Sequence, residues 1–93
     1  MWQVYIVECI DKSLYCGITK DIVRRIYQHN NTKQGAKYTR SRRPVVLLWN
    51  RKISTRSQAS SLEAAIKKLS RKKKLEIISK NLSLEGLIDF LQT

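Results

Sequence analysis

A chain of 93 residues suits one domain, and its 42% apolar and 28% charged residues exclude a disordered composition. With 19 Lys and Arg against 7 Asp and Glu, its net charge of +12 favours polyanionic partners, nucleic acid first and an anionic membrane surface second. No apolar segment approaches the ~20 residues of a membrane span and no signal peptide is visible, so we expect a cytoplasmic protein.

The beginning of the chain predicts a β-hairpin. Residues 2–9 and 14–18 are rich in β-branched and aromatic residues, and residues 11–13 make a plausible turn between them. Cys9 and Cys16 lack the spacing of a zinc site and would point to opposite faces of these strands. We therefore expect both cysteines to be reduced packing residues.

The length of the hairpin loop decides where two tyrosines point, because side chains alternate faces along a strand. A three-residue loop places Tyr5 opposite Gly17 and leaves Tyr5 and Tyr15 on one face. A two-residue loop would put the tyrosines on opposite faces. The three-residue loop is favoured, since a glycine opposite Tyr5 leaves room for a phosphate or a closely approaching backbone.

A helix is predicted after the hairpin, with Ile22 and Ile26 on its buried stripe. Its candidate ends are Thr19 or Asp21 for the N-cap and Asn30 or Asn31 for the C-terminus. At ~100° per residue, Arg25 and His29 lie on one edge of the stripe. Arg24 points almost the other way, into solvent, so helical geometry prefers Arg25 as a site residue.

The remaining chain predicts one strand and further helices. Residues 31–44 form a polar, basic connection, and the apolar run Val45–Trp49 is interpreted as the central, most buried strand. A helix follows over about residues 57–69, Ser70 can cap the next segment, and a last short helix begins at Ser83.

Positive charge is concentrated in the middle of the chain. Residues 20–56 carry 11 basic side chains and one acidic side chain, and residues 57–80 carry 7 and 2. The first nineteen residues and the last thirteen are slightly acidic. The positive field therefore lies beside the tyrosines, the arginine and the histidine, as binding along a phosphate backbone requires.

Two tyrosines, an arginine and a histidine that converge in a strongly basic protein suit the chemistry of a phosphodiester. Together with a downstream glutamate, they resemble the GIY-YIG nuclease family. The matching elements are Val4-Tyr5, Tyr15-Cys16-Gly17, Arg25, His29 and Glu63. Lys37-Tyr38-Thr39 and Arg42-Arg43-Pro44 also look like its small stand-alone bacterial members. The resemblance covers about residues 2–80.

The resemblance implies an α+β fold, a small three-stranded antiparallel sheet flanked by helices. Residues 1–93 would form a single domain, with a core over about 2–80 and a C-terminal helical extension over 81–93. The implied activity is divalent-metal-dependent hydrolysis of DNA phosphodiester bonds, selective for DNA structure and linked to DNA repair or processing. Mg²⁺ or Mn²⁺ would be the cofactor and DNA the partner, with RNA as a further candidate.

The resemblance also implies roles for individual residues. Tyr5 would activate the attacking water with help from Tyr15 and His29, Arg25 would hold the scissile phosphate, and Glu63 would anchor the metal. Further substrate contacts are expected from Gly17, Lys37, Tyr38, Arg42 and Arg43.

The sequence departs from the family pattern at two positions. Gln3 replaces the first glycine of the signature, and Ile18 stands where repair nucleases carry a lysine. The role of that lysine is either absent or passed to Lys20 or Lys37.

Two other functions remain open from the sequence: a catalytically weak or inactive nucleic-acid-binding module, and a basic protein that docks an acidic partner. The site residues have structural alternatives too. Glu63 is four residues before Lys67 and can pair with it on a helix, and His29 can interact with a helix dipole.

Overall fold

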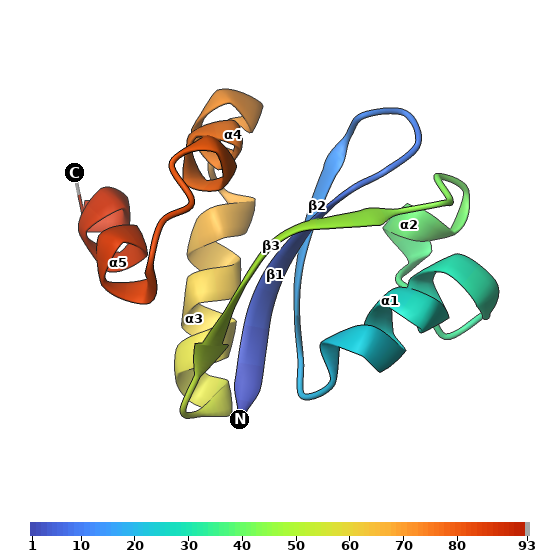
Figure 1. The fold of residues 1–93 in the computed structure, drawn as a ribbon, viewed down its shortest axis with the longest axis horizontal. Coiled ribbons are helices and arrows are strands. Elements are labelled where there is room, and N and C mark those ends of the chain that lie inside the picture. The colour runs from blue at the N-terminus through green and yellow to red at the C-terminus, as the bar shows by residue number, and fades with distance from the viewer. Residues whose placement is uncertain (93) are drawn as a thin grey trace.

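The computed structural model describes residues 1–92 and has an α+β fold, as predicted (Figure 1). Strands β1 (Trp2–Glu8), β2 (Leu14–Thr19) and β3 (Val46–Ile53) form an antiparallel sheet in the order β2-β1-β3. The helices are α1 (Ile22–Asn31), α2 (Lys37–Arg40), α3 (Arg56–Lys67), α4 (Arg71–Ser79) and α5 (Leu84–Gln92).

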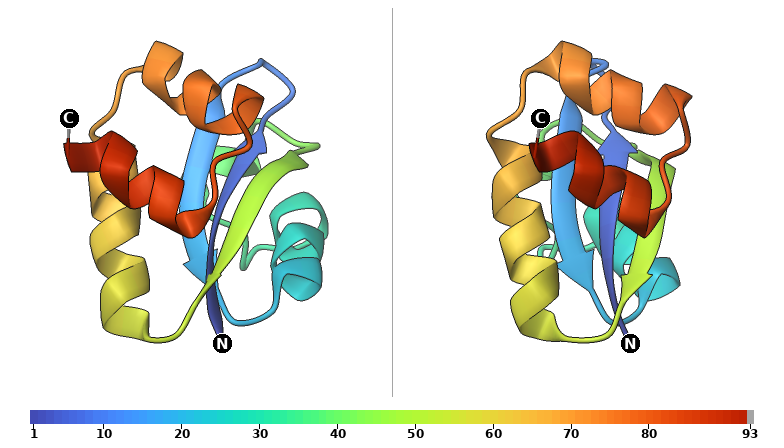
Figure 2. Two further views of the ribbon diagram at one scale, coloured as in Figure 1. Left: turned by 60° about the vertical axis from the view of Figure 1, so that its left-hand side comes forward. Right: turned by 90° about the vertical axis from the view of Figure 1, so that its left-hand side faces the viewer.

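Helices cover both faces of the sheet, with α3, α4 and α5 on one side and α1 and α2 on the other (Figures 1 and 2). The alternation of β1 explains why both faces are apolar. Val4 and Ile6 belong to the larger core under α3, α4 and α5, whereas Tyr5 and Val7 belong to the smaller core under α1. The sheet therefore separates a packing core from a face that carries tyrosines.

The register of the hairpin confirms the three-residue loop. The Cys9 amide donates to the Ser13 carbonyl at 2.8 Å, and Tyr5 pairs with Gly17. In this register Tyr5 and Tyr15 lie on the same face of the sheet. Cys9 and Cys16 are free and buried in the two different cores, as predicted.

The prediction that residues 45–49 form the central strand is wrong, because β1 occupies the centre and β3 lies at an edge. Val46 is 57% exposed and Leu48 37% exposed. An apolar run shows that a segment is partly buried but does not show how many strands flank it. The connection over residues 31–44 also contains the short helix α2, which the sequence pattern did not predict.

The C-terminal extension packs onto the larger core. Leu87 on α5 is fully buried there, and Leu84, Ile88 and Leu91 pack around it, so the predicted last helix is confirmed. Thr93, at the end of the predicted extension, lies outside the described residues. Over residues 1–92, every helix is too short or too polar to cross a membrane.

Candidate active site

Tyr5 lies against Gly17 on the face of the sheet that α1 covers. The tyrosine is only 1% exposed, and a Cβ added to Gly17 would lie 2.5 Å from the Tyr5 hydroxyl oxygen. The space that the sequence analysis left for a phosphate or a closely approaching backbone is therefore filled by the Tyr5 ring. Gly17 is required here because any side chain would displace the hydroxyl.

Helix α1 presents His29 to this tyrosine. Asp21 starts the helix by accepting a hydrogen bond from the Arg24 amide at 3.1 Å, as one of the predicted caps. Two turns later His29 is fully buried, and its Nε2 lies 2.7 Å from the Tyr5 hydroxyl oxygen. The rings of Tyr15 and His29 also meet edge to face, with centroids 5.5 Å apart. Both tyrosines therefore contact the histidine, as the sequence predicts.

Thr39 on α2 completes a hydrogen-bonded chain that the sequence analysis did not identify. The Thr39 hydroxyl donates to the Ala36 carbonyl at 3.0 Å, and its oxygen lies 2.9 Å from His29 Nδ1. Because its one proton is used on the carbonyl, the hydroxyl must accept from Nδ1–H. Neutral His29 then has an unprotonated Nε2, which accepts the hydroxyl proton of Tyr5.

Gly35 allows α2 to approach α1 closely enough for this chain. A Cβ on Gly35 would lie 2.9 Å from the Gln28 carbonyl oxygen and from the His29 Cα. The single glycine of the connection, Gly35, was the available signal for this close approach.

Burial keeps both partners of the Tyr5–His29 bond uncharged near neutral pH. Burial raises the pKa of Tyr5 to about 12, although the neighbouring Arg25 opposes the shift. Burial, and then the charges of Arg25 and Arg43, lower the pKa of His29 to about 4. The resting pair is therefore a phenol that donates to a neutral imidazole.

Arg25 lies beside this pair and is half-buried, whereas Arg24 is exposed, as helical geometry predicts. The Arg25 guanidinium donates from Nη1 to the Gln34 carbonyl at 2.9 Å and to the Gln28 side chain at 3.2 Å. Its charge acts on both Tyr5 and His29. The arginine is thus held close to the tyrosine by polar groups that an anion can replace.

Glu63 lies on α3, which covers the face of the sheet opposite to the one that carries Tyr5. Its carboxylate lies 3.6 Å from Lys67 Nζ, and that ammonium lies 5.5 Å from the centre of the Tyr15 ring. The helical pair that the sequence offered as an alternative is therefore present. Its lysine reaches the ring of Tyr15, whereas the Glu63 charge acts on Cys16 in the larger core. Lys67 is thus a lysine that lies against the ring of Tyr15, whereas the sequence analysis left the role of the repair-nuclease lysine either absent or passed to Lys20 or Lys37.

Glu63 is the available metal ligand. No group of three or more His, Cys, Asp and Glu side chains within residues 1–92 has the arrangement of a metal site. A single half-buried carboxylate fits Mg²⁺, which commonly keeps several waters and uses one or two carboxylates together with substrate phosphates. The donor set therefore suits a hard cation that is bound jointly with the substrate.

The predicted substrate contacts in the connection have different environments. Tyr38 stacks on Tyr15 with ring centroids 5.9 Å apart, and the Arg42 guanidinium lies 4.1 Å from the centre of the Tyr38 ring. Arg42 also pairs with Asp11 at 3.0 Å. Tyr15, Tyr38 and Arg42 therefore form a continuous stack of two aromatic rings and a guanidinium.

Arg43 and Lys37 differ from these two residues. The Arg43 guanidinium donates to the His29 carbonyl at 2.6 Å and to the Thr32 carbonyl, so it holds the end of α1. Lys37 is exposed at the start of α2. The structure thus gives Arg43 a supporting role for the helix that carries His29.

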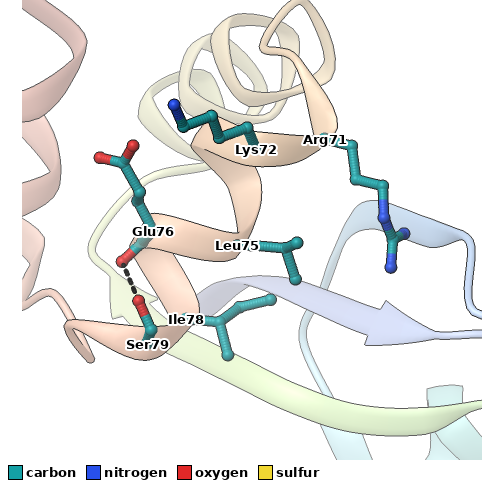
Figure 3. A pocket seen from close by; sticks show the side chains of 6 residues that line it. All are labelled: Arg71, Lys72, Leu75, Glu76, Ile78 and Ser79. Carbon is teal, nitrogen blue, oxygen red and sulfur yellow. Dashed lines mark hydrogen bonds between the residues drawn. The ribbon is translucent and has the colours of Figure 1, made fainter.

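Two small polar hollows lie near the opposite ends of β2. One, of about 200 Å³, is lined by Thr19, Lys20, Asp21, Arg24, Arg25 and Gln28. The other, of about 220 Å³, is lined by Ser13, Leu14, Tyr38, Arg71 and Lys74. A larger depression of about 550 Å³ on α4 is bordered by Leu75 and Ile78 and contains none of the tyrosines (Figure 3).

Comparisons with known proteins agree with this geometry. The GIY-YIG catalytic domain matches residues 1–76. The chain is 52% identical over 77 residues to a UPF0213 protein of Desulfotalea psychrophila, covering 83% of this chain and 70% of that one. It is 54% identical over 76 residues to a UPF0213 protein of Staphylococcus saprophyticus, covering 82% and 92%.

Solved structures support the same relationship. The solution NMR structure of a UPF0213 protein from Bacillus halodurans has a TM-score of 0.55 and 39% identity, covering 100% of this chain and 95% of that one. An NMR structure of an E. faecalis protein has a TM-score of 0.58 and 44% identity, covering 84% and 82%. The chain therefore belongs to the GIY-YIG family, a family of nucleases acting on nucleic acid, and its close relatives are the bacterial UPF0213 proteins.

Proposed function

We propose that the protein is a divalent-metal-dependent endonuclease that hydrolyses DNA phosphodiester bonds in the cytoplasm, in DNA repair or processing. The observation that carries this proposal is the chain of hydrogen bonds from Tyr5 through His29 to Thr39. Such a chain fixes the histidine so that a bare ring nitrogen faces a hydroxyl, which is the arrangement of a general base.

In this mechanism Tyr5 takes a proton from the attacking water while its own proton passes to His29 Nε2. The pKa values of about 12 and about 4 make this transfer unfavourable in the resting site by an amount on the order of 10 kcal/mol. The transfer therefore needs additional charge at the site, with an anion near the imidazole and a cation near the phenol.

Arg25 links substrate binding to this proton transfer. A phosphate bound to its guanidinium would offset the positive charge that now lowers the pKa of His29, so the histidine would become a stronger base. The planar guanidinium suits a phosphate and would stabilise the charge that develops on it. A divalent cation held at Glu63 would supply the positive charge that stabilises the leaving oxygen and favours phenolate character at Tyr5.

The test is cleavage of plasmid and branched DNA by the purified protein with Mg²⁺ or Mn²⁺. Arg25→Ala and Glu63→Ala are expected to abolish cutting, whereas Lys52→Ala, which removes one positive charge from an exposed position of β3, is expected to keep it. Undiminished cleavage by both site variants would identify a contaminating nuclease and refute the proposal.

A second candidate function is a nucleic-acid-binding module without catalysis. The observation that favours it is the Glu63–Lys67 pair, because the ammonium already neutralises the carboxylate that a metal ion needs. This alternative predicts binding that weakens steeply with salt and no cutting with any divalent metal.

A further inference from the structure

The hollow beside the β1–β2 hairpin combines residues from three distant parts of the chain. Ser13 and Leu14 come from the hairpin, Tyr38 from α2, and Arg71 and Lys74 from α4. These α4 cations belong to a run of four basic residues. The fold thus brings a remote basic segment to the surface that carries the site tyrosines.

Arg71 is directed toward this hollow and not along α4. Figure 3 shows its side chain extending to the hairpin, on the side away from Lys72. Its guanidinium donates to the Lys12 carbonyl in the hairpin loop. This contact uses one donor and leaves other N–H groups of the guanidinium for a ligand.

The hollow has an excess of positive charge. Its lining contains no acidic side chain, and the salt bridges found across residues 1–92 include neither Arg71 nor Lys74. The two carboxylates of the hairpin are already paired, Glu8 with Lys12 and Asp11 with Arg42. Two cations that share about 220 Å³ repel each other, and an anion bound between them would relieve that repulsion.

The position of the hollow relates it to the site. Tyr38 lines it and stacks on Tyr15, which in turn contacts His29. The second polar hollow, which includes Arg25, lies at the other end of β2, about 17 Å away at ~3.3 Å per residue. A nucleic-acid strand laid along β2 would cover that distance with several nucleotides, since the rise per base is about 3.4 Å.

We infer that the hollow lined by Tyr38, Arg71 and Lys74 binds an internal backbone phosphate of the nucleic-acid strand, a few nucleotides from the phosphate at Arg25. The inference rests on the proposed function for the identity of the strand but does not require cleavage. Lys74 and Arg71 are the cationic ligands, and the strand follows β2 from one hollow to the other.

The test measures binding of fluorescent DNA by anisotropy between about 50 and 200 mM salt, because phosphate contacts weaken steeply over this range. The 93-residue protein carries Glu63→Gln and is assayed without divalent metal, so that no DNA is cut. Lys74→Ala is compared with Lys72→Ala, a matched loss of charge on α4 outside the hollow. Lys74→Arg and thermal unfolding control for loss of structure.

Lys74→Ala is expected to reduce the slope of log K against log salt by about 0.9 for duplex DNA or about 0.7 for a single strand. Lys72→Ala should leave the slope nearly unchanged, and Lys74→Arg should restore it. Equal effects of the two alanine variants would overturn the inference, because they would reflect net charge alone. An effect seen only with 5′-phosphorylated DNA would also overturn it, in favour of a terminal phosphate.

The binding test and the cleavage test can give opposite results, so they distinguish the phosphate site from the nuclease activity. A difference between Lys74→Ala and Lys72→Ala in a protein that never cuts DNA would support the phosphate site and refute the nuclease. Cleavage that depends on Arg25, without that difference, would support the nuclease and refute the phosphate site.

Discussion

Replacing Thr39 by valine tests the hydrogen-bonded chain directly, because valine keeps the shape of threonine and lacks the hydroxyl. The change leaves the Nδ1–H of His29 buried without an acceptor, which destabilises the protein by about 1–3 kcal/mol. The imidazole can avoid this loss by moving its proton to Nε2. That tautomer would donate to Tyr5 and could no longer accept the tyrosine proton.

The expected effect on catalysis is large, since general acid–base catalysis typically contributes about 10²–10⁴ in rate. We therefore expect Thr39→Val to lower single-turnover cleavage by at least about 10²-fold while DNA affinity changes little. Thr39→Ser keeps the hydroxyl and should restore most of the rate. Loss of activity in both variants, with equal loss of stability, would indicate damage to packing.

Nitrogen-15 NMR can observe the tautomer without any cleavage assay. His29 is the single histidine of the sequence, so its ring signals need no further assignment. The wild-type protein should show a proton on Nδ1, and Thr39→Val should shift the population toward Nε2. An unchanged tautomer with unchanged cleavage would refute the reasoning that Thr39 orients the ring.

Two further predictions follow from the same residues. For His29, the folded-state pKa of about 4 lies below the ordinary 6.5, so the unfolded chain binds the extra proton between these values and the free energy of unfolding falls by about 3 kcal/mol as pH drops from 6.5 to 4. Denaturant unfolding should show this slope in the wild type and not in His29→Gln, and an NMR titration midpoint near 6.5 would contradict it. Gly17→Ala should displace the Tyr5 hydroxyl, cost about 1–3 kcal/mol by overpacking and impair cleavage. Gly86→Ala on α5, where the new Cβ lies 3.3 Å or more from its neighbours, is the matched control, and equal behaviour of the two variants would count against the close packing of Tyr5 on Gly17.

The periodicities of strands and helices were sufficient to predict the side-chain directions of site residues that lie on long regular elements. The two-residue period of a strand and the glycine at position 17 together predicted the register of the hairpin, because a shift by one residue would turn Tyr15 to the other face. The helical period likewise separated Arg25 from Arg24. In both cases each side chain direction follows from neighbours that are close in sequence.

The parts that sequence could not predict depend on contacts between distant segments. Helix α2 has four residues, which is too short for a periodic apolar pattern, so neither the helix nor the acceptor role of Thr39 was visible. The direction of Arg43 depends on carbonyl groups at the end of α1. The edge position of β3 depends on which strands pair with β1, and the apolar run at residues 45–49 carries no information about that choice.

The positive charge of the chain and the burial of the site both affect the protonation of His29. Arg25 and Arg43 lower the pKa of His29, so the positive charge that attracts a polyanion also keeps the imidazole unprotonated while the site is empty of substrate. In the proposed mechanism, a phosphate at Arg25 would offset part of that charge effect and raise the basicity of His29 when Tyr5 must lose its proton. Activation of Tyr5 would therefore depend on the arrival of substrate, because the arginine that would bind the phosphate is the one that lowers the pKa of the histidine.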